Sequence, residues 1–163
     1  QVELASVSPP LALPAQVDRM RAKIRAAERL LGANTAAAID AVPPPTTHLL
    51  CHGDLHPSNV ILTADGPVLI DWFDASRGEP LGDVARTTLL LAATGEHSHL
   101  AGPRDVADTA LDALRGAYLD AVAERGDADD AALARWRAVN AAARLAEGVD
   151  PAPLLAAWRE WVS

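Results

Sequence analysis

The residues best suited to chemistry lie in one polar segment, His52-Gly53-Asp54-Leu55-His56-Pro57-Ser58-Asn59, and at Asp71 a short distance further on. Asp71 and Asn59 offer the hard oxygen ligands that Mg²⁺ prefers. Asp54 could accept the proton of an attacking hydroxyl group. Phosphoryl transfer needs mainly such positioning and charge neutralisation, so the pattern favours a magnesium-dependent phosphoryl-transfer site.

Short apolar runs surround these polar residues and must position them. They predict strands at 49–51, 60–62 and 68–70. The turn Thr63-Ala64-Asp65-Gly66 predicts that the last two strands form a hairpin. Such a hairpin would carry Asn59 and Asp71 to the same end of adjacent strands.

The wording of these motifs resembles a known family. Protein kinases carry H-R-D-x-x-x-x-N and then D-F-G; here Gly53 replaces the arginine, and Asp71-Trp72-Phe73 stands where D-F-G would be. The segments H-G-D-L-H-P-S-N and I-D-W are similar to those of the aminoglycoside phosphotransferase family, which has a protein-kinase-like fold. The resemblance is strong from about Cys51 to Arg86 and weak elsewhere.

The resemblance implies a role for each matching residue. Asp54 would be catalytic, Asn59 and Asp71 would hold Mg²⁺, and His52 would support the loop. ATP or GTP would be the phosphoryl donor, and the acceptor would be a small molecule with a hydroxyl group, either an antibiotic such as an aminoglycoside or a metabolite. A role in antibiotic resistance follows as an expectation.

Asp83 lies in a segment that predicts a nearly all-apolar, buried helix over residues 80–93. A buried carboxylate needs a partner. By resemblance, Asp83 ties this helix to the catalytic loop. Alternatively, it is an ordinary first-turn carboxylate that interacts with the helix dipole.

Two other functions remain open from the residues alone. His52, Asp54 and His56 could alternate as zinc or iron ligands of a metal-dependent hydrolase, although this leaves Asn59 and Asp71 unexplained. A non-catalytic, kinase-like binding module is the second alternative, but the intact set Asp54, Asn59 and Asp71 argues against lost chemistry.

The remaining sequence is mainly helical. Apolar spacing, caps and prolines predict helices at 14–31, 35–41, 80–93, 103–124, 129–147 and 151–162, with Trp158 and Trp161 packing the last one down. The expected fold class is therefore mainly α with a small β-hairpin. By resemblance, residues 14–163 form the C-terminal lobe of a protein-kinase-like fold, with the catalytic loop at 52–59 and substrate-side helices at 103–162; residues 1–13 are a linker or a remnant of the lobe connector.

A kinase-like enzyme also needs a glycine-rich phosphate loop and a lysine on a strand. No glycine-rich loop precedes His52, and the single lysine, Lys23, lies in a helical pattern. We therefore expect the N-terminal nucleotide lobe to be absent from this sequence and the isolated chain to be inactive.

Composition excludes several classes. Half of the 163 residues are apolar, which indicates a globular chain. One cysteine excludes an internal disulfide and fits a cytoplasmic location, and no apolar run or basic leader predicts a membrane span or a signal peptide. The net charge of −8 argues against nucleic acid and is compatible with a cationic acceptor.

The substrate-binding residues are not identified by the sequence. The acidic candidates for an acceptor pocket are Asp74, Glu79, Asp120, Glu124, Asp127, Asp129, Asp130, Glu147 and Glu160.

Overall fold

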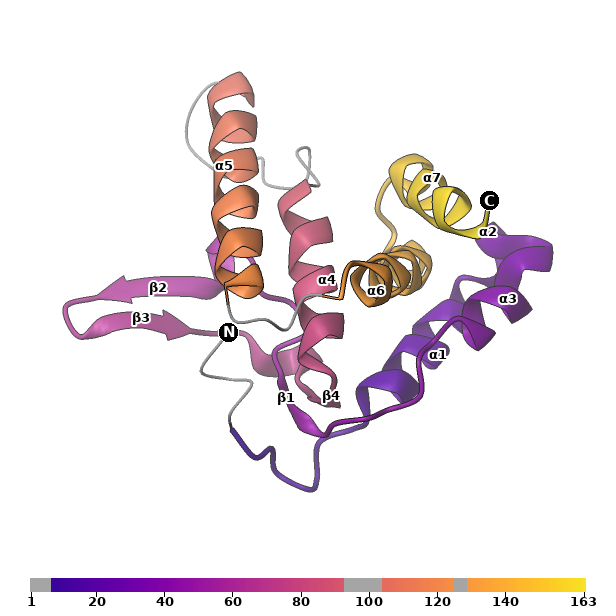
Figure 1. Ribbon diagram of the computed structural model, residues 1–163, viewed down its shortest axis with the longest axis horizontal. Coiled ribbons are helices and arrows are strands. Elements are labelled where there is room, and N and C mark those ends of the chain that lie inside the picture. Colours follow the sequence, from indigo (N-terminus) through magenta and orange to yellow (C-terminus); the bar gives the residue numbers. More distant parts are fainter. Residues whose placement is uncertain (1–6, 93–103, 125–128) are drawn as a thin grey trace.

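The computed structural model describes residues 7–92, 104–124 and 129–163. Most of this part of the chain is helical (Figure 1). The elements in chain order are α1 (Gln16–Ala26), α2 (Glu28–Leu31), η2 (Gly32–Asn34), α3 (Thr35–Asp40), β1 (Leu49–Cys51), η3 (Pro57–Asn59), β2 (Val60–Thr63), β3 (Gly66–Leu69), η4 (Trp72–Asp74), β4 (Ser76–Gly78), α4 (Pro80–Ala92), α5 (Arg104–Ala123), α6 (Asp130–Arg144), η5 (Leu145–Glu147) and α7 (Pro151–Val162).

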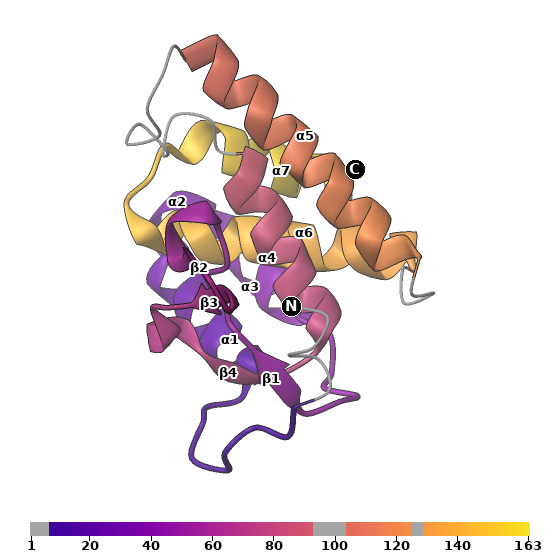
Figure 2. The same cartoon turned by 90° about the vertical axis from the view of Figure 1, so that its left-hand side faces the viewer.

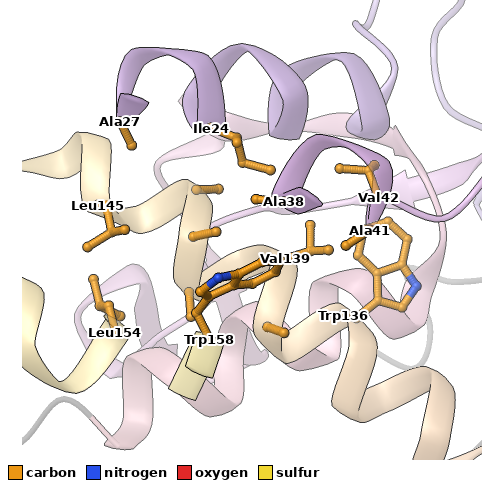
Figure 3. Packing of buried hydrophobic residues seen from close by; sticks show 14 of the residues in the cluster. Ile24, Ala27, Ala38, Ala41, Val42, Trp136, Val139, Leu145, Leu154 and Trp158 are labelled. Atoms are coloured by element: carbon orange, nitrogen blue, oxygen red, sulfur yellow. The ribbon is translucent and has the colours of Figure 1, made fainter. Parts of the chain in front are cut away.

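The main hydrophobic core lies where α1, α3, α4, α6 and α7 meet (Figure 3). Its centre is α6, whose alanines Ala138, Ala141 and Ala142 are almost completely buried. Such small side chains allow the neighbouring helices to approach α6 closely, and larger groups such as Trp158 fill the remaining space. This arrangement fixes α4, the helix beneath the candidate site.

Helix α4 lies between α5 and α6 (Figures 1 and 2). It is buried from Gly82 to Leu91, as its apolar sequence predicts. By contrast, α5 buries Leu111 and Val122, while Leu114 of the expected apolar stripe remains 46 % exposed. None of the helices in the described ranges combines the length and apolar character that a membrane crossing needs.

Two small antiparallel sheets are present, where the sequence indicated one hairpin. The expected hairpin is β2–β3, with Val60 opposite Leu69. The additional sheet pairs β1 with β4, so that Cys51 lies opposite Ser76. The sequence of β4, Ser-Arg-Gly, has no apolar alternation and therefore did not predict a strand. The strand is held by its pairing with β1, which is distant in the sequence.

Two further expectations need correction. The helix expected over residues 14–31 is divided at Ala27, which leaves the helical region with φ −87° and ψ 5°. Trp158 packs the last helix down with 1 % exposure, but Trp161 remains 38 % exposed. Its ring lies against that of Trp158, 5.7 Å between centroids. Helical spacing places both tryptophans near one face without fixing which of them reaches the core.

Candidate active site

The loop over residues 52–59 connects β1 to β2 and is anchored at its start by Asp83. The Asp83 carboxylate, 1 % exposed in the first turn of α4, accepts hydrogen bonds from the backbone N–H groups of His52 at 2.9 Å and Gly53 at 2.7 Å. A buried carboxylate is stable only when its oxygens are bonded in this way. Asp83 therefore ties α4 to the loop.

His52 supports the same loop from inside the protein. Its ring is completely buried, with Nε2 3.0 Å from the carbonyl oxygen of Ile70 and Nδ1 3.3 Å from the backbone nitrogen of Asp54. Since a carbonyl can only accept and a backbone N–H can only donate, Nε2 carries the proton and Nδ1 accepts. The ring also packs against Trp72, 4.6 Å between centroids. His52 thus links the loop to the segment that carries Asp71.

These bonds also bear on the hydrolase alternative. Both ring nitrogens of His52 are used by the backbone, so neither is available to a metal. Within the described ranges, no three histidine, cysteine, aspartate or glutamate side chains are placed to hold a metal ion together. The geometry gives no support to a zinc or iron site made by His52, Asp54 and His56.

Gly53 allows the loop to pass close to η4. Its φ of +80° is a conformation that other residues rarely adopt, and a Cβ there would lie 2.4 Å from the carbonyl oxygen of Asp74. The position that kinases fill with arginine must therefore be glycine in this backbone.

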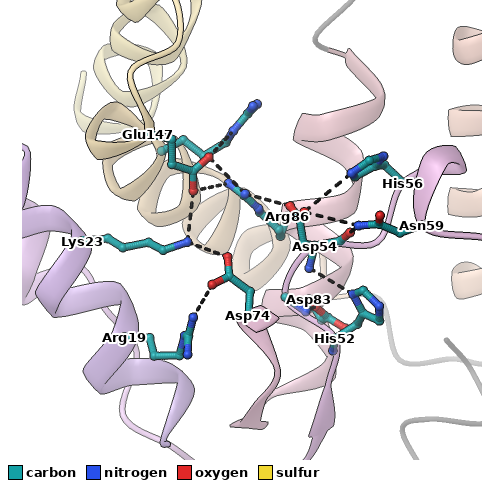
Figure 4. Close-up of polar contacts among 12 residues, drawn as sticks. Arg19, Lys23, His52, Asp54, His56, Asn59, Asp74, Asp83, Arg86 and Glu147 are labelled. Atoms are coloured by element: carbon teal, nitrogen blue, oxygen red, sulfur yellow. Dashed lines mark hydrogen bonds and ion pairs between the residues drawn. The ribbon is translucent and has the colours of Figure 1, made fainter. Parts of the chain in front are cut away.

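Asp54 and Asn59 are brought together by the turn at η3 (Figure 4). The Asn59 side-chain nitrogen donates to the Asp54 carbonyl oxygen at 2.8 Å and approaches its carboxylate Oδ2 at 3.4 Å. Both contacts use the amide nitrogen, so they leave the amide oxygen, the atom that would bind a metal, unused. Asn59 is 6 % exposed.

Asp71 follows the second strand of the hairpin. The backbone N–H of Ile70 donates to the carbonyl of Asn59 at 3.0 Å, so Ile70 lies opposite Asn59 and Asp71 is the next residue beyond this pair. Asp71 has φ 59° and ψ 66°, the only positive φ outside glycine in the described residues. Its exposed carboxylate makes no hydrogen bond or ion pair within those residues. Strained backbone of this kind is typical of functional sites.

A network of charged side chains extends from Asp54 across the cleft (Figure 4). Arg86 donates to Asp54 at 3.0 Å and to Glu147 at 3.1 Å. Lys23 in turn contacts Glu147 at 3.1 Å and Asp74 at 2.8 Å. The sequence reasoning did not identify Arg86, although a charged residue in an otherwise apolar helix signals a buried partner.

The acidic candidates divide by position. Asp74 and Glu147 line an open cleft of about 530 Å³ together with Asp54, Arg86 and Lys23. Glu79 binds the backbone of Thr46 and Thr47, and Asp129 caps α6. Asp120, Glu124, Asp130 and Glu160 do not line this cleft. Asp127 lies outside the described residues.

The cleft carboxylates Asp74 and Glu147 are held in the ionised form. Burial alone would raise the pKa of Asp74, but Lys23 and Arg19 lower it below its ordinary value. In the same way, burial alone would raise the pKa of Glu147, but Arg86 and Lys23 lower it below its ordinary value. These carboxylates therefore favour the folded state at neutral pH.

Acid should remove this contribution. Because the folded-state pKa values are depressed, the stabilisation is present above the ordinary carboxylate pKa of about 4 and is lost as pH falls through the folded-state values. The free energy of unfolding should fall as the pH is lowered from 6 to the acid limit of folding. We expect this fall to be ~1 kcal/mol smaller in an Asp74→Asn variant than in the parent, as measured by urea unfolding at each pH. An exposed control, Glu160→Gln, should follow the parent; equal acid sensitivity of Asp74→Asn and the parent would contradict the assignment.

Cys51 takes no part in this chemistry. Its side chain is completely buried, and burial with nearby Asp83 raises the pKa of the thiol. A protonated thiol is a poor nucleophile and metal ligand. Cys51 acts as a small core residue, as its place in an apolar strand predicts.

The mainly helical fold with two small antiparallel sheets is compatible with part of a kinase-like protein. The model of the phosphotransferase enzyme family matches residues 8–125, which is most of the chain, and the chain therefore belongs to this family of enzymes. The match agrees with the resemblance of the H-G-D-L-H-P-S-N and I-D-W motifs to aminoglycoside phosphotransferases. None of the curated proteins matches the chain.

Proposed function

We propose that this chain carries the catalytic loop and the acceptor side of a magnesium-dependent kinase, which moves the γ-phosphoryl group of ATP or GTP to a hydroxyl group of a small molecule. The observation that carries the proposal is the shared anchoring of the loop. Asp83 and His52 hold the loop that bears Asp54 and Asn59, and His52 binds the backbone immediately before Asp71. Membership of a phosphotransferase family supports the same chemistry.

The donor set fits magnesium. Asn59 keeps its amide oxygen unused, and Asp71 presents an exposed carboxylate without a protein partner among the described residues. Oxygen ligands of this kind, few in number and combined with phosphate and water, suit Mg²⁺. Bound there, magnesium would neutralise charge on the phosphate oxygens.

Asp54 would act on the acceptor. Its Oδ1 is held by Arg86 at 3.0 Å, and Oδ2, which the Asn59 amide nitrogen approaches at only 3.4 Å, is the oxygen proposed to accept the proton of the acceptor hydroxyl. In the reaction the acceptor oxygen forms a bond to the γ-phosphorus, the bond from that phosphorus to the diphosphate oxygen breaks, and the proton moves to Asp54. The His56 ring, 3.6 Å from Oδ2, lies beside the same oxygen.

The cleft suggests a limit on the acceptor. A cationic acceptor would have to compete for Asp74 and Glu147 with side chains that already bind these carboxylates. Arg19 and Lys23 bind Asp74, and Lys23 and Arg86 bind Glu147. We therefore propose an acceptor with few positive charges, entering beside Asp54, in place of the strongly cationic ligand that the net charge of the chain would allow.

The phosphate grip is proposed to come from a separate nucleotide-binding lobe, with the chain described here serving as the C-terminal lobe. Lys23, the single lysine of the sequence, lies on helix α1 and is engaged by Asp74 and Glu147, so it is not placed as the strand lysine that contacts the phosphates. A cytoplasmic location is part of the same proposal, because ATP and GTP are the donors.

The direct test is phosphoryl transfer by the intact protein, by which we mean this chain together with the proposed nucleotide-binding lobe. Incubation with ATP or GTP labelled at the γ-phosphate and a panel of neutral, anionic and polycationic alcohols should label at least one acceptor, and only in the presence of Mg²⁺. Removal of the metal with EDTA should abolish the transfer, and re-addition should restore it. Nucleotide binding without transfer to any alcohol would instead favour a binding module, and metal-independent transfer would contradict the proposed mechanism.

A further inference from the structure

Arg86 and Glu147 form a two-point contact beside Asp54 (Figure 4). Arg86 Nη1 lies 3.0 Å from Glu147 Oε1, and Nη2 lies 3.1 Å from Oε2. A guanidinium and a carboxylate that meet at two points are fixed in distance and in rotation. The Arg86 side chain is only 7 % exposed, so water has little access to loosen it.

The same guanidinium fixes Asp54. Arg86 Nη2 donates to Asp54 Oδ1 at 3.0 Å, so one nitrogen joins Asp54 and Glu147. The rotation of Arg86 set by Glu147 therefore also sets the position of the Asp54 carboxylate. The hydrogen bond is made to Oδ1, so Oδ2 is the Asp54 oxygen that Arg86 does not bind.

Glu147 is itself anchored before it meets Arg86. Lys23 Nζ lies 3.1 Å from Oε1, and Arg144 Nε donates to Oε2 at 3.2 Å. Lys23 comes from α1, whereas Arg144 ends α6 in the core. The Glu147 carboxylate thus joins two core helices to the loop through Arg86. Glu147 itself lies outside residues 8–125, the part of the chain that matches the family model.

We propose that Glu147 is a positioning residue: through Arg86 it holds the Asp54 carboxylate in the orientation that accepts the proton from the acceptor. The inference rests on the proposed function for its kinetic consequence. Its geometric content, that Glu147 fixes Asp54, stands apart from any activity.

The kinetic test breaks the clamp, by which we mean the two-point contact between Glu147 and Arg86, without changing the size of the side chain. Glu147→Gln keeps the size of the side chain but removes the charge that binds Arg86 at two points. We expect kcat for phosphoryl transfer to fall ~10- to ~100-fold, because small misplacement of a catalytic group has effects of that size, with the nucleotide KM unchanged. Arg86→Lys, which keeps the charge but loses the fork, should lower kcat similarly, and the double variant should be little worse than either single one.

Controls separate positioning from general stability. Arg135→Lys removes another guanidinium, which makes no contact with the described residues of the Asp54 network but donates to the carbonyl of Ala41 at 2.7 Å. This variant should leave kcat unchanged. Thermal unfolding of each variant shows whether the fold is retained. An unchanged kcat in folded Glu147→Gln, or fully additive effects in the double variant, would overturn the inference while leaving the proposed function intact.

A crystal structure distinguishes the remaining case. If the parent protein transfers phosphate to no alcohol, the proposed function fails, and the position of Asp54 still tests the clamp. Parent crystals should show Arg86 joined to both Asp54 and Glu147, and Glu147→Gln crystals should show the Asp54 carboxylate turned or in two positions. An Asp54 carboxylate in the same place in both crystals would overturn the inference.

Discussion

An Asp54→Asn variant of the intact protein should lose at least ~10²-fold in kcat, in line with the usual contribution of a general base, while its affinity for the nucleotide stays nearly constant. The asparagine retains the size of the side chain and an oxygen that can accept from Arg86. What it cannot do is take a proton from the acceptor hydroxyl. Steady-state kinetics with varied nucleotide and varied acceptor separate the two effects.

The matched control for this substitution is Asp65→Asn. Asp65 is an exposed aspartate in the turn of the β2–β3 hairpin, so the same chemical change is made away from the loop. Its kinetics should equal those of the parent. Full activity of Asp54→Asn would show that Asp54 is not the base, and a loss confined to nucleotide KM would assign it to binding instead.

Replacement of Asp71 should act on the metal and not on the proton. We expect Asp71→Asn to weaken magnesium-dependent nucleotide binding by at least ~10²-fold, because loss of even an outer partner of a metal ligand costs ~10- to ~100-fold. Asparagine is the informative substitution because it tolerates the left-handed conformation that Asp71 adopts, with φ 59°. Calorimetric titration of ATP into the protein, with and without Mg²⁺, measures the effect.

An Asp71→Ala variant adds backbone strain to the loss of the ligand, because alanine disfavours positive φ. If binding were lost in Asp71→Ala but retained in Asp71→Asn, the conformation of the segment, and not the carboxylate, would be the essential feature. Equal magnesium-dependent binding by Asp71→Asn and the parent would contradict the assignment of Asp71 as a ligand.

Local signals in the sequence account for the elements that position the loop. The turn Thr63–Gly66 and its apolar flanks predicted the hairpin, and its register pairs Val60 with Leu69. The uniform apolarity of residues 80–93 predicted a buried helix, and α4 is buried from Gly82 to Leu91. Both features depend on neighbouring residues, which a pattern can represent.

Contacts between distant segments could not be predicted in this way. β4 exists because Ser76 and its neighbours pair with β1, and no apolar alternation signals that pairing. The clamp joins Arg86 to Glu147, which is separated from it by most of the C-terminal half of the chain. Glu147 appeared in the sequence only as one of several acidic residues, since nothing local distinguishes a cleft carboxylate from a solvated one.

The proposed function requires that Asp54, Asn59 and Asp71 form one metal-assisted phosphoryl-transfer site. Crystals of the intact protein grown with Mn²⁺ in place of Mg²⁺ and a non-hydrolysable ATP analogue would test it, because the anomalous signal locates the metal. The metal should lie within bonding distance of the Asn59 amide oxygen and the Asp71 carboxylate, with the γ-phosphate facing Asp54. Metal and nucleotide bound away from these residues, or an Asp71 carboxylate that contacts neither, would contradict the account.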